Sequence, residues 1–229
     1  MTAIPILFAA CLGQERGGVS PKLGMPLVVG VLSKGQVSGS LEYWGRCDLN
    51  QLPDFPKLHS LEMSRGSTVQ DLKEIFVDDP EMQVTQEPDG TIRMVEADVP
   101  RDLLDLRISH ISFRLEHGTK DVLYDPRDAL RAILKTPEVA IFMTANDIGP
   151  PFDFEEAHGG IQPSPKLPHI SGNLDNVTLS QALDYVLRTF PGLWVYENCP
   201  SKKNKRAVFF TFFRSGPVGQ ALEKRERIP

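Results

Sequence analysis

The sequence predicts an α+β protein, built as small two-layer sandwiches in which helices cover one face of a mixed sheet. Two observations predict this class. A unit of helix cap, short amphipathic helix, proline and apolar strand occurs three times, over 68–84, 125–141 and 178–195, at a spacing of about 55 residues. Alternating apolar strands and turn residues fill the intervals, so the expected order from residue 106 to residue 214 is β-α-β-β-α-β-β.

Each expected helix begins at a residue whose side chain can cap it. Thr68, Asp125 and Thr178 carry oxygens that accept hydrogen bonds from the N–H groups of a first helical turn. A proline follows each helix and stops it, because proline lacks an N–H group and favours extended geometry in the preceding residue. We therefore expect helices over 68–77, 126–135 and 179–189.

A strand is expected directly after each of these prolines, starting near Met82, Val139 and Leu193. Turn residues then connect the first strand to a partner over 91–95, and the third to a partner over 208–213, so each pair forms a hairpin.

Further strands are expected ahead of the helices, over 58–63, 106–115 and 169–174. In the second of them the apolar parity changes at His110, which predicts a bulge or a twist.

The first part of the chain predicts an extra β-hairpin. A β-branched run at 27–32 and an alternating run at 37–44 flank a turn over 33–36. We expect four regions: an N-terminal segment with this hairpin (1–57), a half unit (58–97), a complete unit (98–214) and a C-terminal tail (215–229).

Composition excludes some functions. The 229 residues are 41% hydrophobic and carry a net charge of −5, which does not suggest a broad cationic face for nucleic acid. The longest apolar run, 4–12, is far shorter than the roughly 20 residues that cross a bilayer.

The cysteines bear on the compartment. None of Cys11, Cys47 and Cys199 forms a C-x-x-C motif. The first residues resemble a bacterial lipobox, which implies a lipid anchor at Cys11 of an exported protein. Cys47 and Cys199 would then be left to form one disulfide or to stay unpaired. The alternative is a cytoplasmic chain with three buried thiols, whose first residues form a core strand.

The run Ser171–Leu187 resembles the short N-terminal domain of secretins and TonB-dependent receptors (the STN-type domain), in which a strand, Asn-Val-Thr-Leu, an Ala-Leu helix and a hairpin follow one another. The resemblance covers 106–214, and 58–96 looks like a further half. It implies a periplasmic recognition module without chemistry of its own, which binds another envelope protein through strand edges or associates with itself.

The expected partner surface is the third hairpin. Leu193–Val195 and Val208–Phe213 should offer backbone edges, and its turn carries cations that would steer an acidic partner. The candidate partner-binding residues are Lys202, Lys203, Lys205, Arg206, Phe209 and Phe213.

The alternative function is a small-molecule or metal site, possibly of an enzyme, in the acidic connection 149–168. Its carboxylates and imidazole are those of Asp153, Glu155, Glu156 and His158, although their spacing matches no known metal loop. His59 and His169 occupy equivalent places ahead of two helices, which favours packing over catalysis. The chain has no common hydrolase, nucleotide-binding or zinc-protease motif, so we expect no catalytic residue and no cofactor.

Overall fold

The computed structural model describes residues 21–45, 67–114, 123–149, 167–201 and 205–215. The helices in these ranges are α1 (Pro21–Lys34), α2 (Thr68–Ile75), α3 (Pro126–Leu134), α4 (Pro137–Ala145) and α5 (Leu179–Thr189). The strands are β1 (Gly39–Trp44), β2 (Met82–Gln86), β3 (Ile92–Glu96), β4 (Arg107–Ser112), β5 (Ile148–Gly149), β6 (Asn173–Thr178), β7 (Gly192–Pro200) and β8 (Arg206–Arg214).

A six-stranded mixed sheet forms the centre of the protein, and its strand order is β2-β3-β1-β7-β8-β5. β1 runs parallel to both β3 and β7, whereas the hairpins β2–β3 and β7–β8 are antiparallel. β4 and β6 form a separate antiparallel pair. The predicted α+β class is confirmed, and one sheet takes strands from both the early and the late part of the chain.

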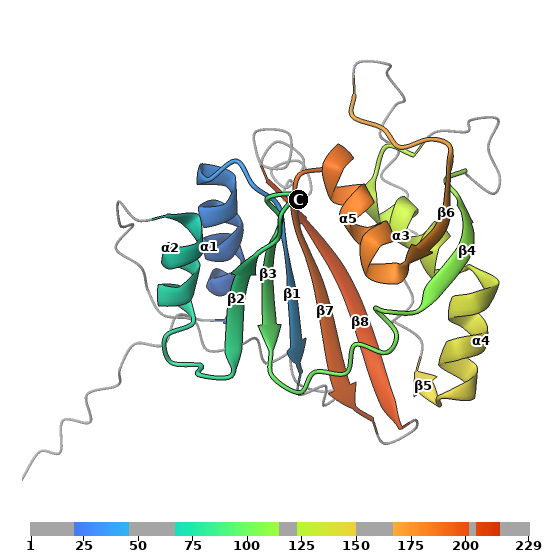
Figure 1. Cartoon of the computed structure of the whole chain (residues 1–229), viewed down its shortest axis with the longest axis horizontal. Coiled ribbons are helices and arrows are strands. Elements are labelled where there is room, and N and C mark those ends of the chain that lie inside the picture. Colours follow the sequence, from blue (N-terminus) through green and yellow to red (C-terminus); the bar gives the residue numbers. More distant parts are fainter. Residues whose placement is uncertain (1–20, 46–66, 115–122, 150–166, 202–204, 216–229) are drawn as a thin grey trace, which may run out of the picture.

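Helices cover both faces of this sheet, so the arrangement has one layer more than the expected two. Successive residues of β7 show this most directly. Leu193 and Val195 belong to the apolar cluster of α1 and α2, whereas Trp194 and Tyr196 belong to the cluster of α3 and α5. Figure 1 shows α1 and α2 on one side of the strands and α3, α4 and α5 on the other.

Three helices lie where the sequence predicts them, namely α2, α3 and α5. Asp125 caps α3 by accepting from the N–H of Arg127, and Thr178 caps α5 within a capping box. The cap of α2 is one residue earlier than predicted: Ser67, not Thr68, accepts from the backbone of Gln70.

The expected N-terminal hairpin is wrong in its first half. Residues 27–32 belong to α1, and only the second half is a strand, β1. Met25, Val28 and Leu32 are buried and recur at helical spacing, so they form one stripe of α1 against the sheet. This packing outweighs the strand preference of the β-branched run.

The strand expected near Val139 is also wrong, because residues 137–145 form α4. Pro137 ends α3 and then occupies the first turn of α4, where its missing N–H is not needed. Val139 and Met143 lie one helical turn apart and are both buried. The strand that follows is β5, of only two residues.

The two strands of the small sheet explain the parity change at His110. Ile108 and Ile111 are both buried, yet β4 and β6 keep the same register on either side of them. Asn176 of β6 has a φ of 54°, so the pair twists there without an inserted residue. β6 begins at Asn173, later than the expected 169–174, and the expected strand 58–63 lies outside the described residues.

Candidate functional site

The expected basic turn is only partly placed by the structure. Two of its residues lie outside the described part of the chain: Lys202 and Lys203. Lys205 is exposed, and its backbone N–H donates to the Asp147 carboxylate at 2.8 Å. Arg206 is 8% exposed, and its guanidinium donates to Asp102 Oδ1 at 2.5 Å. Of these two placed cations, only Lys205 presents its charge at the surface.

The two aromatic residues of the expected site lie on one face of β8. Phe209 and Phe213 are both half-buried, and Phe213 packs against the apolar cluster of α1 and α2. The structure therefore gives Phe213 a packing role. Whether either ring also contacts a partner stays a prediction.

The expectation that Leu193–Val195 forms an open edge is wrong. These residues pair with Gly39–Leu41 of β1 on one side and with Thr211–Phe213 of β8 on the other. β7 is therefore an internal strand, and its backbone groups are used within the sheet.

The outer side of β8 is covered over its first half. β5 pairs with Arg206 and Ala207 at its start. The next outward-facing residues, Val208 and Phe210, are 0% and 4% exposed. At the far end, Arg214 donates to the carbonyl oxygen of Tyr124 at 3.1 Å.

The opposite edge of the sheet, formed by β2, is exposed. β2 is the terminal strand, and only β3 pairs with it among the described strands. Gln83, Thr85 and Gln86 are exposed, whereas Met82 and Val84 are buried against the cluster of α1 and α2. The strand carries no charge and no proline, the usual devices that protect such an edge.

The hydrogen-bond pattern identifies the groups that point outward from β2. Glu87 donates to the carbonyl of Thr91, and Ala97 donates to the carbonyl of Glu81, so odd-numbered residues of this strand bond to β3. The N–H and C=O groups of Val84 and Gln86 therefore face away from the sheet. No hydrogen bond to these four groups is formed by the described residues. We call this outward side of Met82–Gln86 the open edge.

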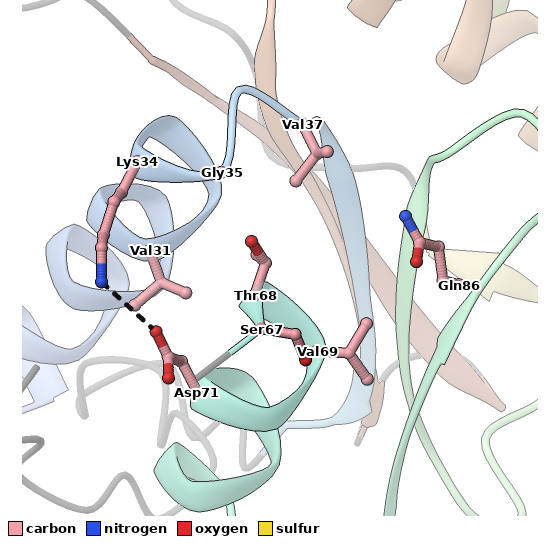
Figure 2. Close-up of a pocket in the computed structure, with 9 residues that line it drawn as sticks. All are labelled: Val31, Lys34, Gly35, Val37, Ser67, Thr68, Val69, Asp71 and Gln86. Carbon is pink, nitrogen blue, oxygen red and sulfur yellow. Dashed lines mark ion pairs between the residues drawn. The ribbon is translucent and has the colours of Figure 1, made fainter. Parts of the chain in front are cut away.

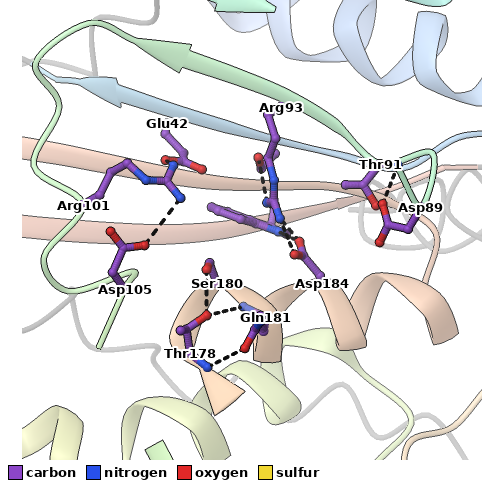
Figure 3. A network of polar contacts seen from close by, with 12 residues as sticks. Glu42, Asp89, Thr91, Arg93, Arg101, Asp105, Thr178, Ser180, Gln181 and Asp184 are labelled. Carbon is purple, nitrogen blue, oxygen red and sulfur yellow. Dashed lines mark hydrogen bonds and ion pairs between the residues drawn. The ribbon is translucent and has the colours of Figure 1, made fainter. Parts of the chain in front are cut away.

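A polar network fixes the strand behind the open edge. Arg93 of β3 donates to both carboxylate oxygens of Asp184 in α5, and one of these contacts measures 3.0 Å. The indole N–H of Trp194 donates to the same carboxylate at 2.9 Å. Figure 3 shows Arg93 reaching from the sheet to Asp184. This network holds β3, and thereby the hairpin that carries β2, against α5.

A second set of contacts fixes the segment after β3. Arg101 forms an ion pair with Glu42, which is fully buried in β1, and lies 3.7 Å from Asp105 (Figure 3). Burial raises the pKa of Glu42 in spite of the neighbouring Arg101 guanidinium. Tyr196 donates to the carbonyl of Pro100 at 3.2 Å. These contacts are those of a structural brace.

A cavity of about 450 Å³ lies between α1, α2 and the end of β2. Val31, Val37 and Val69 supply apolar walls, and Gln86 faces it from β2 (Figure 2). Its ionisable groups, Lys34 and Asp71, lie 3.7 Å apart as an ion pair. This is not a pairing of nucleophile and base, so the cavity does not suggest catalysis.

The alternative metal site receives no structural test. Asp153, Glu155, Glu156, His158 and His59 lie outside the described residues. Within the described ranges no three His, Cys, Asp or Glu side chains come together to hold a metal ion. His169 lies 5.7 Å from Tyr124, ring centre to ring centre, which is a packing contact.

Cys199 is fully buried and disulfide-bonded, and the other cysteine of this bond lies outside the part of the chain that the structure describes. Among the described helices, none is long and apolar enough to span a membrane.

Comparisons with known proteins found no matching family model, curated protein or solved structure.

Sequence reasoning missed the open edge. The signal was present in the run Met82–Gln86, which is a strand pattern without a charge, placed between acidic residues. What the pattern could not show was the position of this strand at the end of the sheet, because that depends on the pairing of distant strands.

Proposed function

We propose that the chain is a non-enzymatic binding module of the bacterial cell envelope, which docks an extended segment of a partner protein on the open edge of β2. One observation carries the proposal. The outward N–H and C=O groups of Val84 and Gln86 have no hydrogen-bond partner among the described residues, and they lie on the uncharged terminal strand of the sheet. An added strand gains its affinity from hydrogen bonds to groups of this kind.

The stability of the edge supports this mode of binding. Arg93 and Asp184 tie β3 to α5, and Met82 and Val84 anchor β2 in the core. A partner strand would therefore meet an ordered template, which lowers the entropic cost of association.

Two observations support an envelope location. The disulfide at Cys199 is of a kind that persists in oxidising compartments, which include the bacterial periplasm. The order β6-α5-β7-β8 is the strand, helix and hairpin order of the STN-type domain that Ser171–Leu187 resembles. Such domains recognise other proteins, and this chain would do so with β2.

The test uses a proline at the end of the open edge. Gln86→Pro removes an outward N–H that has no described partner, so the fold should be retained, while Gln86→Thr keeps that N–H. The probe is a labelled peptide of alternating valine and threonine with lysines at both ends. We expect fluorescence anisotropy to show at least about fivefold weaker binding to Gln86→Pro than to Gln86→Thr. Equal binding to the two folded variants would contradict docking at this edge.

A further inference from the structure

We infer that the segment docked on β2 carries lysine or arginine on both sides of its paired residues. This inference rests on the proposed function and specifies the chemistry of the partner. It follows from the acidic residues at the two ends of the open edge, which disfavour a second copy of this chain and favour a basic segment.

The end of the open edge next to Met82 is strongly acidic. Glu81 is exposed directly before the strand, and Glu96 of β3 pairs with Met82 across the hairpin. Burial raises the pKa of Glu96, and the negative charges of Asp79 and Glu81 raise it further. The hydrogen bond that Glu96 accepts from the Trp44 N–H acts in the opposite direction. Three carboxyl groups therefore lie close enough to influence one another.

The other end is also acidic, but less so. Glu87 and Asp89 are exposed directly after the strand. Asp89 accepts from the N–H of Thr91, which lowers its pKa, and the charge of Arg188 acts in the same direction. No lysine or arginine occurs from residue 78 to residue 91, and the nearest cation of the hairpin, Arg93 of β3, also lowers the pKa of Asp89.

These charges disfavour a second copy of this chain as the docked strand. Outward-facing residues pair with outward-facing residues, so two antiparallel β2 strands would meet with Val84 opposite Val84. That register places Glu81 of each copy directly opposite Glu87 of the other. Like charges directly opposite each other destabilise a strand pair.

The same arrangement favours a segment with basic residues at its ends. Its central residues would bond to Val84 and Gln86, and its flanking cations would lie beside Glu81 and Glu87. Both acids are exposed, so each contact contributes modestly and weakens with salt. The effect should be larger at Glu81, because Arg188 partly compensates the charge near Glu87 and Asp89.

The experiment compares three labelled peptides that share the valine and threonine centre and differ only at the ends, which are lysine, serine or glutamate. We expect the lysine peptide to bind most tightly, the glutamate peptide least, and the difference to shrink at high salt. Glu81→Gln should weaken lysine-peptide binding about threefold and Glu87→Gln somewhat less. Asp175→Asn removes a carboxylate on the separate β4–β6 sheet and serves as the matched control.

The outcomes separate this inference from the proposed function. If all three peptides bind equally and Gln86→Pro weakens each, docking at β2 stands and the basic partner is wrong. If the lysine peptide binds best but Gln86→Pro has no effect, the acids attract it elsewhere and docking at β2 is wrong. If the free chain forms a concentration-dependent dimer and Gln86→Pro abolishes it, the occupant of the open edge is a second copy of the chain and the basic partner is wrong.

Discussion

The two edges of the central sheet differ in how they are covered. At the β8 edge, β5 pairs with the first two residues, Arg206 is turned inward onto Asp102, and Val208 is fully buried. At the β2 edge, no further described strand pairs with β2, the outward groups of Val84 and Gln86 have no described partner, and Gln83, Thr85 and Gln86 are exposed. One sheet therefore has an end that is closed and an end that is open.

The proposed function rests on this difference. An inward-pointing charge and a short covering strand are ordinary means of closing an edge against unwanted pairing. The β8 edge uses both of them. The β2 edge uses neither and instead has acidic residues beyond both of its ends. Under the proposed function, these acids would disfavour self-pairing and attract a basic segment. The predictions below test this contrast, from the largest expected effect to the smallest.

The largest effect should come from the core beneath the sheet, away from both edges. Leu183 of α5 is fully buried, so Leu183→Ala should lower the free energy of unfolding by about 2 to 5 kcal/mol. Val84→Ala at the open edge should cost only about 1.5 kcal/mol, since it removes two methyl groups. Chemical denaturation measures both. A larger loss of unfolding free energy for Val84→Ala than for Leu183→Ala would contradict this ranking.

The internal strand β7 holds a buried acid, Glu197. Burial raises the pKa of Glu197 to about 7, although Tyr43 donates to its carboxylate. The folded state therefore keeps this proton up to a higher pH than the unfolded state does. Stability from this group is complete below pH 4.5, falls as pH rises to about 7, and stays low above it.

Glu197→Gln isolates this contribution. The variant should flatten the decrease between pH 4.5 and 7 and gain on the order of 2 kcal/mol relative to the natural chain at pH 8. Denaturant unfolding at several pH values measures it. Identical pH profiles for the two chains would show that this carboxyl group ionises normally.

The smallest effect concerns the ion pair that closes the β8 edge. Arg206→Gln should cost about 1 to 2 kcal/mol, because it removes a charged hydrogen bond to Asp102 but leaves that carboxylate half-exposed to water. Glu81→Gln at the open edge should change stability by less than about 0.5 kcal/mol. Similar losses for both variants would mean that the two edges are held in the same way.

Local signals predicted much of the fold, and long-range pairing supplied the rest. Caps and apolar stripes located α2, α3 and α5, and turn residues located the hairpins β2–β3 and β7–β8. The sequence Thr136-Pro137-Glu138 is equally compatible with a helix end and a helix start, and packing of Val139 and Met143 decided for α4. The insertion of β1 between β3 and β7 has no local signature, so neither the internal position of β7 nor the open edge at β2 could be predicted.

Amide hydrogen exchange measured residue by residue tests the open edge most directly. In the free protein, the N–H groups of Val84 and Gln86 should exchange much faster than those of Gln83 and Thr85, which bond to β3. Adding the lysine-ended peptide should slow the exchange of the Val84 and Gln86 amides and leave the exchange of the Gln83 and Thr85 amides unchanged. Equal protection of all four amides in the free protein, or peptide binding that leaves Val84 and Gln86 exchanging fast, would contradict the account.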